Sequence, residues 1–411
     1  MRKHFLFLTA AVSLSVAAHA QGPEVTSWKI NTTGATGYNG IPSNVQQVQY
    51  STGNVYISAT CIPGYSIGPW NGNPNTPSNQ NFVFKITRSP QKNGGTLTNI
   101  GLGHTGVWTN GVSIFNVSDA QSYNNQGVWN RNAYFFEGSG FDNCLGHPQQ
   151  NGEYHHHVSP TCLYNDLDST HHSPIIGFAF DGFPVYGAYA YADTNGGGGI
   201  KRMRSSYQLR NITDRTTLPN GSAAPSAGPA ISSTYPLGAF IEDYVYTAGS
   251  GDLDTHNGRW CKTPEYPNGT YAYFVTIAAD RTPVFPYTMY GTYYGVVQNG
   301  NTGPNSGHNT ITETVTTYTP TSGGVQGVKE EVTTLIYPNP TSDYLFVYIN
   351  PVASNNFTLT LTDVTGKTVL SMENVQPTIS YSLDVTKLAK GSYTLTLRNT
   401  EKHYTETVVV K

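Results

Sequence analysis

The chain has 411 residues, a formal net charge of −3 and only 11% charged side chains, against about 25% in typical globular domains. The sequence has no basic stripe that could bind a phosphate backbone, and this excludes nucleic-acid binding. The length exceeds one ordinary hydrophobic core and predicts at least two domains, while the 29 tyrosines favour short strands joined by many turns.

The first twenty residues have the pattern of a signal peptide. Arg2 and Lys3 precede an apolar run, and the small-residue site Ala18-His19-Ala20 predicts cleavage before Gln21. The apolar run is short for a membrane span of ~20 residues, and no later segment is long and apolar enough to be one. We therefore predict a mature chain without a transmembrane span, located outside the cytoplasm.

Residues 21–297 are predicted to form one aromatic-rich β domain with little helix. Short stretches alternate in polarity or run apolar between turn signals, as half-buried strands do. These stretches are NVYISATC (54–61), QNFVFKI (80–86), NAYFFEG (132–138), IIGFAFDGFPVYGAY (175–189) and GTYAYFVTIAA (269–279).

The chain changes character twice after this region. Residues 298–333 are poor in apolar side chains and rich in Asn, Thr, Gly and Ser, a composition typical of flexible linkers. Regular strand patterns return in residues 334–411, with turn signals between them. This spacing predicts a small, immunoglobulin-like β-sandwich tail.

Four cysteines suit an oxidising compartment, where disulfides persist. They allow three pairings, and the sequence alone does not choose among them. We favour Cys144 with Cys162, because they bracket a run of histidines, and Cys61 with Cys261 by elimination.

The histidine run is the strongest chemical signal. Residues 151–162 read NGEYHHHVSPTC, and six histidines lie between 147 and 172. If EYHHHV is a strand, His155 and His157 project from one face, ~6.6 Å apart along the backbone, and His156 points to the other. Two imidazoles so placed can converge on one ion, and imidazole suits zinc and copper.

A metal site at this strand needs further ligands from elsewhere. The candidates are His147, His171, His172 and Asp181, the last of which lies between aromatic residues in FAFDGFP. Tyr154 and Arg259 are candidates for contact with a substrate. The alternative is that these histidines are structural and satisfied by backbone carbonyls or tyrosine hydroxyls.

The tail resembles the type A C-terminal sorting domain of cargo of the bacterial type IX secretion system. The matching pieces are YPNPTSDYL (337–345), LTDVTGKTV (361–369), LAKGSYTLTL (388–397) and the basic end at Lys411. The resemblance implies recognition by the type IX machinery at the outer membrane, and a secreted or cell-surface protein.

The preceding region resembles the YHYH domain family over about residues 80–297. NGEYHHHVSPTCL, HSPIIGFAFDGFPVYG, DLDTHNGR and TPEYPNGTYAYFVT occur in that order. The Tyr-His-Tyr-His run of the family reads Tyr154-His155-His156-His157 here, so His156 replaces the second tyrosine. The resemblance indicates where a site lies and supplies no reaction.

The sequence therefore predicts an exported β protein that binds a divalent transition metal, copper or zinc, through a histidine cluster. Whether it is an enzyme stays open. The ligands would suit a metal-dependent hydrolase or a copper oxidoreductase, and no nucleophile motif supports a serine hydrolase. The alternative is a non-catalytic surface module that binds a glycan, a small molecule or a protein, with tyrosines as stacking platforms.

Overall fold

The computed structural model describes residues 21–303, 306–320, 334–337, 339–342, 344–349, 356–375, 380–399 and 403–411. The predicted signal peptide and residues 304–305 and 321–333 of the predicted linker lie outside these ranges. The described residues are mainly β, which confirms the predicted fold class; their α-helices are the short α1 (Pro23–Thr26) and α2 (Ala133–Glu137). None of the helices in these ranges is long and apolar enough to cross a membrane.

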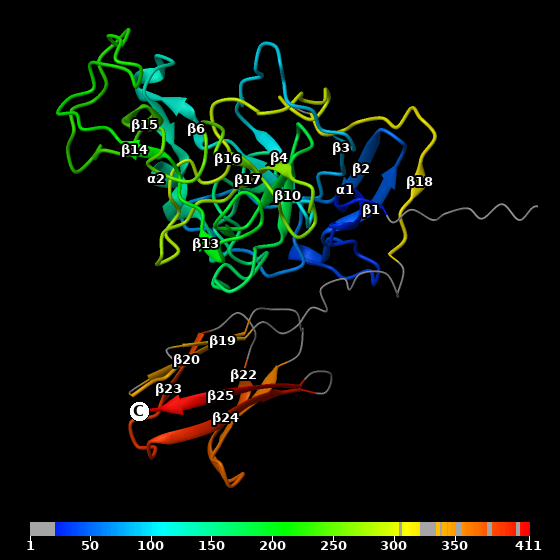
Figure 1. Cartoon of the computed structure of the whole chain (residues 1–411), viewed down its shortest axis with the longest axis vertical. Helices are drawn as coiled ribbons and strands as arrows, with labels where there is room; N and C mark the ends of the chain where they lie inside the picture. Colours follow the sequence, from blue (N-terminus) through cyan, green and yellow to red (C-terminus); the bar gives the residue numbers. More distant parts are fainter. Residues whose placement is uncertain are drawn as a thin grey trace, which may run out of the picture.

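An eight-stranded mixed sheet forms the centre of the first region (Figure 1). Its strands are buried almost throughout, because apolar and aromatic residues occupy both faces. Their order is β16 (Gly258–Cys261), β17 (Thr270–Phe274), β11 (Pro184–Tyr186), β10 (Ile175–Ala179), β4 (His104–Trp108), β5 (Ser113–Phe115), β9 (Tyr154–His156) and β8 (His147–Pro148).

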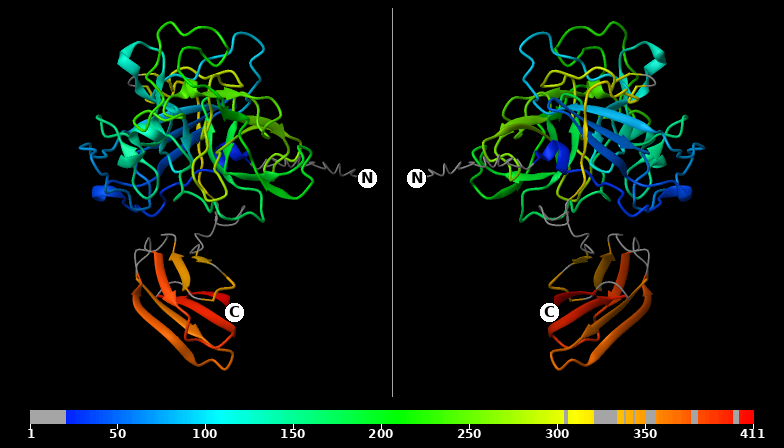
Figure 2. Two further views of the ribbon diagram at one scale, coloured as in Figure 1. Left: turned by 90° about the vertical axis from the view of Figure 1, so that its left-hand side faces the viewer. Right: turned by 90° about the vertical axis from the view of Figure 1, so that its right-hand side faces the viewer.

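A second, four-stranded sheet shares the core of the first. Val48, Val55 and Phe84 from this sheet belong to the same buried cluster as Trp108 and Phe178 from the central sheet. The two sheets therefore form one packed body, as the two side views of Figure 2 also show. The strands are β18 (Thr316–Thr317), β1 (Val45–Tyr50), β2 (Asn54–Ala59) and β3 (Phe82–Thr87).

Three two-stranded ribbons and four 3₁₀ turns complete the described part of this region. The ribbons are β6 (Ser118–Ser122) with β7 (Asn130–Asn132), β12 (Tyr189–Tyr191) with β13 (Ile200–Arg202), and β14 (Tyr207–Leu209) with β15 (Tyr244–Tyr246). The turns are η1 (Tyr38–Gly40), η2 (Tyr123–Asn125), η3 (Gly138–Gly140) and η4 (Ile241–Asp243).

Part of the segment with linker composition packs against the four-stranded sheet. Asn301 is fully buried and its side-chain oxygen accepts from the backbone N–H of Lys85 at 2.9 Å. β18 pairs with β1, and the Glu313 carboxylate accepts from the Tyr56 hydroxyl at 2.6 Å. The polar side chains of this part of the predicted linker therefore form hydrogen bonds with the four-stranded sheet.

The tail forms two sheets around a core of its own. Alternate residues of the strand Phe357–Thr362 (β21), namely Phe357, Leu359 and Leu361, are buried between the sheets, as a period of two requires. One sheet contains β19 (Thr334–Tyr337), β20 (Tyr344–Ile349) and β23 (Ser380–Asp384); the other contains β22 (Thr368–Val375), β21 (Phe357–Thr362), β24 (Gly391–Arg398) and β25 (His403–Val410).

The stretch 132–138 differs from expectation because it is helical where a strand was predicted. Asn132 caps α2, and its side-chain oxygen accepts the N–H of Tyr134. The aromatic run that favoured a strand packs instead around one helical turn. This places Glu137 at the C-terminal end of α2, beside the histidines.

Candidate metal centre

Strand alternation and cross-strand pairing bring three imidazoles together. His155 lies in β9, and His157 follows one residue after that strand, so both rings project from one face. His147 in β8 stands directly opposite His155 in the antiparallel register, and such residues share a face. One ligand atom from each of these three buried histidines lies within 4.8 Å of the others.

The ring atoms converge closely, and a carboxylate joins them. The Nε2 atoms of His155 and His157 are 3.1 Å apart. Glu137 Oε2, at the end of α2, lies 3.1 Å from His157 Nε2 and 3.5 Å from His147 Nε2. The cluster is thus three imidazoles and one carboxylate around a common point.

Backbone carbonyls fix the tautomers of two of the rings. His155 Nδ1 lies 3.1 Å from the Glu153 carbonyl oxygen, and His157 Nδ1 lies 2.5 Å from the Asn116 carbonyl oxygen. A carbonyl only accepts, so both Nδ1 atoms carry the proton, and in the neutral rings both Nε2 atoms are bare lone pairs. These lone pairs face each other and the Glu137 carboxylate.

His147 is held differently. Its Nδ1 lies 3.3 Å from the side-chain nitrogen of Asn73, whose side-chain oxygen already accepts from Asn75 N–H. The Asn73 amide therefore donates to Nδ1 and places the His147 proton on Nε2. A cation at that nitrogen requires the proton to move to Nδ1 and the Asn73 amide to turn.

Burial sets the protonation of the cluster. It lowers the pKa of His147 to about 4, with help from the neighbouring His157, and it lowers the pKa of His155 well below its usual value. Burial also acts to raise the pKa of Glu137, but its interactions with His157, His147 and Arg131 outweigh this, and the pKa lies below its usual value. The neutral rings of His147 and His155 therefore face an ionised carboxylate at neutral pH.

Aromatic packing holds the rings in place. The ring of Phe115 stacks on His155 with centroids 3.7 Å apart, and Phe141 lies parallel to His157 at 6.1 Å. The three histidines are between 2% and 8% exposed, whereas the Glu137 side chain is 29% exposed. Solvent reaches the cluster from the side of α2.

The other predicted ligands do not join this cluster. His171 is 79% exposed on its side chain and pairs with Asp168 at 2.9 Å. His172 packs among Tyr186, Tyr191 and Phe274. His171 and His172 lie in an irregular segment that leads into β10. Because β10 is three strands away from β9 in the sheet, their closeness in sequence to His155 and His157 does not bring them to the cluster.

Asp181 is fully buried elsewhere. Its carboxylate accepts from the Tyr273 hydroxyl at 2.6 Å and from the N–H groups of Gly295 and Phe183 at 2.8 Å and 3.2 Å. Burial raises its pKa to about 6. Its role is to join three chain segments, and it is not a metal ligand in this arrangement.

The two residues expected to contact a substrate are both buried and lie apart. Tyr154 is fully buried, and its hydroxyl donates to Asp142 at 2.9 Å, so it is a core residue. Arg259 is in β16 at the opposite edge of the sheet, 8% exposed, with one N–H bound to the Tyr191 carbonyl at 2.5 Å.

The favoured disulfide is present and the second is not. Cys144 and Cys162 are bonded, with Cα atoms 5.2 Å apart, whereas Cys61 and Cys261 are buried free thiols. Cys61 Sγ contacts the Tyr154 carbonyl in β9, and Cys261 is in β16. β9 and β16 are six strand spacings apart in the sheet, and at about 4.8 Å per spacing this separates the two sulfurs by roughly 29 Å, beyond the reach of a disulfide. The pairing by elimination was wrong.

The sequence-based prediction missed Glu137, and it left out His156 because that side chain points to the other face of the strand. Glu137 sits in a stretch read as a strand, ten residues before His147, with no local pattern linking it to histidine. His156 is fully buried on the other face of β9, next to Trp108 and Tyr154. Only the helical turn of α2 turns Glu137 toward the cluster.

The fold and the cluster define a histidine-rich β domain followed by a separate β-sandwich. Each of these two parts matches a known protein family. Residues 83–291 match the YHYH protein family, and the chain belongs to that family. Residues 335–411 match the secretion system C-terminal sorting domain, so the protein is exported, to the cell surface or the medium. A search of curated proteins found no match to the chain.

Proposed function

We propose that this exported protein binds one divalent transition metal ion through Nε2 of His147, His155 and His157, with the Glu137 carboxylate as fourth ligand. The observation that carries the proposal is the arrangement of acceptors. Two imidazole lone pairs, fixed by carbonyls on their Nδ1 atoms, lie 3.1 Å apart with a carboxylate oxygen 3.1 Å away. While both rings are neutral, these groups repel one another unless a cation lies between them.

Two buried atoms at the same point support this. His147 Nε2 and Glu137 Oε2 have no hydrogen-bond partner within the described ranges. Buried polar atoms are rarely left without one. A bound cation would satisfy Glu137 Oε2 directly, and it would satisfy His147 Nε2 once the ring proton has moved to Nδ1. The residues present therefore fit a metal ion.

The donor set favours zinc or copper. Three imidazoles and a carboxylate suit both ions, and the compartment reached by export permits either. Two nitrogens at ~2.0–2.1 Å from an ion in tetrahedral geometry stand ~3.3 Å apart, close to the separation of 3.1 Å between His155 and His157.

The exposure of Glu137 bears on chemistry. If it binds, all four positions are protein atoms, as in structural sites; if it swings away, one position opens on the solvent side, as in catalytic sites. When bound, the ion would act as a Lewis acid toward an oxygen at that position. We propose the closed form for the resting protein because Glu137 already faces two of the rings.

We further propose how the chain is divided. Residues 1–20 are removed as a signal peptide. Residues 21–297, together with the described residues up to β18 that pack on them, form the metal-binding domain, and residues 334–411 are the address read by type IX machinery. The sandwich core of the described tail residues and the absence of a transmembrane helix in the described ranges are consistent with this.

Elemental analysis tests the metal proposal. The mature, tag-free chain is dialysed against zinc or copper and then against metal-free buffer, and metal per chain is measured. The expected result is about one equivalent, which the double variant H155A/H157A loses while keeping its circular dichroism spectrum. The matched control is H171A, which removes an exposed imidazole and should retain the full equivalent.

The proposal fails if the wild-type chain holds less than about a tenth of an equivalent under these conditions. It also fails if H155A/H157A and wild type retain metal equally. A supporting readout is thermal: a ligand that binds the folded state raises the melting temperature with concentration, and this rise should disappear in the double variant.

A further inference from the structure

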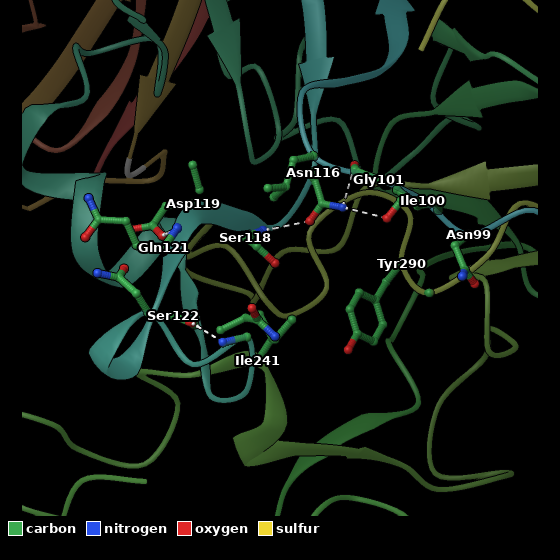
Figure 3. A pocket seen from close by; sticks show the side chains of 16 residues that line it. Asn99, Ile100, Gly101, Asn116, Ser118, Asp119, Gln121, Ser122, Ile241 and Tyr290 are labelled. Atoms are coloured by element: carbon green, nitrogen blue, oxygen red, sulfur yellow. Dashed lines mark hydrogen bonds between the residues drawn. The ribbon is translucent and has the colours of Figure 1, made fainter. Parts of the chain in front are cut away.

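A pocket of about 530 Å³ lies beside the metal centre and differs from it in chemistry. Its walls come from residues 99–102, from the segment 116–130 around β6, and from Ile241, Tyr290 and Gly291 (Figure 3). The volume is within the range of small-molecule sites. None of the predicted site residues lines it.

The pocket wall is rigid where its side chains are bonded. The Asn116 amide donates to the carbonyls of Ile100 and Gly101 at 3.0 Å and 2.8 Å, and its oxygen accepts from Ser118 N–H at 2.8 Å, bonds that Figure 3 marks with dashed lines. Tyr290 packs edge-on against Phe285 and Tyr207, with centroids 5.1 Å and 5.2 Å apart. A ligand would meet a preformed surface.

Other lining groups have no partner in the described part of the chain. The side-chain amides of Asn99 and Asn125, the Ser118 hydroxyl and the Tyr290 hydroxyl form no hydrogen bond there. Each amide or hydroxyl offers both a donor and an acceptor. Figure 3 places Asn99 and Tyr290 on one side of the pocket and Gln121 and Ser122 on the other.

The charges on the wall exclude an anionic ligand. Among the described residues, no Lys, Arg or His lines the pocket. Its one carboxylate, Asp119, is already engaged by Arg131 Nε at 2.8 Å and by Gln121 N–H at 2.6 Å. A phosphate or sulfate would find no cation, and a cation would find a carboxylate that is already paired.

We propose that this pocket binds a neutral, polyhydroxylated ligand, namely a sugar unit of a glycan. Sugar hydroxyls both donate and accept, which matches the amides and hydroxyls of the wall. The ring of Tyr290 offers an apolar face for the C–H side of a sugar. Export to the surface or the medium places the pocket where glycans occur.

The inference does not rest on the metal proposal, although the two sites are neighbours. The Asn116 side chain forms the pocket wall, while its backbone carbonyl accepts from His157 Nδ1. Binding is therefore measured in metal-free and in metal-loaded protein. If the metal-free chain binds sugar, the inference about the pocket holds even if the protein binds no metal.

Calorimetric titration of the mature chain tests the inference with neutral disaccharides as probes: cellobiose, maltose, xylobiose, lactose and diacetylchitobiose. Glucuronate and glucose 6-phosphate serve as charged counterparts. The expected result is that at least one neutral sugar binds with a Kd of about 1 mM or tighter, and that the charged sugars bind more weakly. N99A and Y290F should each weaken the binding by about threefold to tenfold, the loss of one hydrogen bond.

The matched control is N268A, which removes an exposed amide at the turn between β16 and β17 and should bind like wild type. Melting temperatures show that the variants fold. The inference is overturned if no neutral sugar binds at about 10 mM, if a charged sugar binds more tightly than every neutral one, or if N99A and Y290F both bind as wild type does.

Discussion

The Nε2 atoms of His155 and His157 lie 3.1 Å apart, and neither has a proton to offer the other while both rings are neutral. The reason lies outside the cluster, in the carbonyls of Glu153 and Asn116 that hold the Nδ1 protons. Outer partners of this kind orient metal-binding histidines and raise their basicity. These two backbone carbonyls therefore fix the orientation of the His155 and His157 rings in the metal-free protein.

Replacing Glu137 by Gln should weaken metal binding and leave the fold intact. The change keeps the shape of the side chain and removes the only carboxylate that faces the three rings in the described chain. We expect the dissociation constant for zinc to rise by about tenfold to a hundredfold, measured by competition with a chelator. E373Q, which neutralises an exposed carboxylate in the tail, is the control. Equal affinity in E137Q and wild type would remove Glu137 from the ligand set.

The metal-free protein should lose stability as the pH falls from about 6.5 to about 4. Burial lowers the pKa of His147 to about 4 in the folded state, while the unfolded ring titrates near 6.5. Between these values the unfolded state binds more protons, so the unfolding free energy decreases with falling pH, by up to about 3 kcal/mol for this ring. Urea unfolding at several pH values measures it, and H147Q should show a shallower slope. A wild-type slope that H147Q reproduces would contradict the assignment.

The site shows which features a sequence can and cannot predict. The same-face placement of His155 and His157 follows from the period of two in a strand and was predicted correctly. His147 was one of several candidates, because its meeting with His155 depends on the register of β8 and β9. Glu137 was out of reach, since the aromatic run before it suits a strand as well as a helix and only the Asn132 cap decides.

The two thiols should be detectable without reduction. Cys61 and Cys261 are free and buried, so Ellman's reagent should react with neither in the native chain and with two thiols per chain in denaturant. The Cys144–Cys162 bond should release two more after reduction. Its loss should also lower the unfolding free energy by about 3 kcal/mol, as expected for a loop of this size. A denatured, unreduced chain without reactive thiols would show that the second pair is bonded after all.

Replacing Gly146 by Ala should disturb the proposed metal site through His147, the next residue in the chain. A Cβ at this position would lie 2.3 Å from the Tyr154 hydroxyl oxygen and 2.9 Å from His156 Nε2. That hydroxyl is fixed by Asp142, which also accepts from the N–H groups of Gly68 and Gly146, so it cannot move without loss of hydrogen bonds. Overpacking of this kind costs about 1–3 kcal/mol, and the strain falls next to His147.

We therefore expect G146A to unfold at lower urea and to bind zinc more weakly than wild type, because the peptide that carries His147 must shift. The matched control is G94A, where a Cβ meets no atom within 4 Å and φ is not positive; its unfolding free energy should stay within about 0.5 kcal/mol of wild type. If G146A matches G94A in both stability and zinc affinity, the packing behind β8 does not position His147. If G146A loses stability alone, β8 keeps its register and the strain is absorbed on the Tyr154 side.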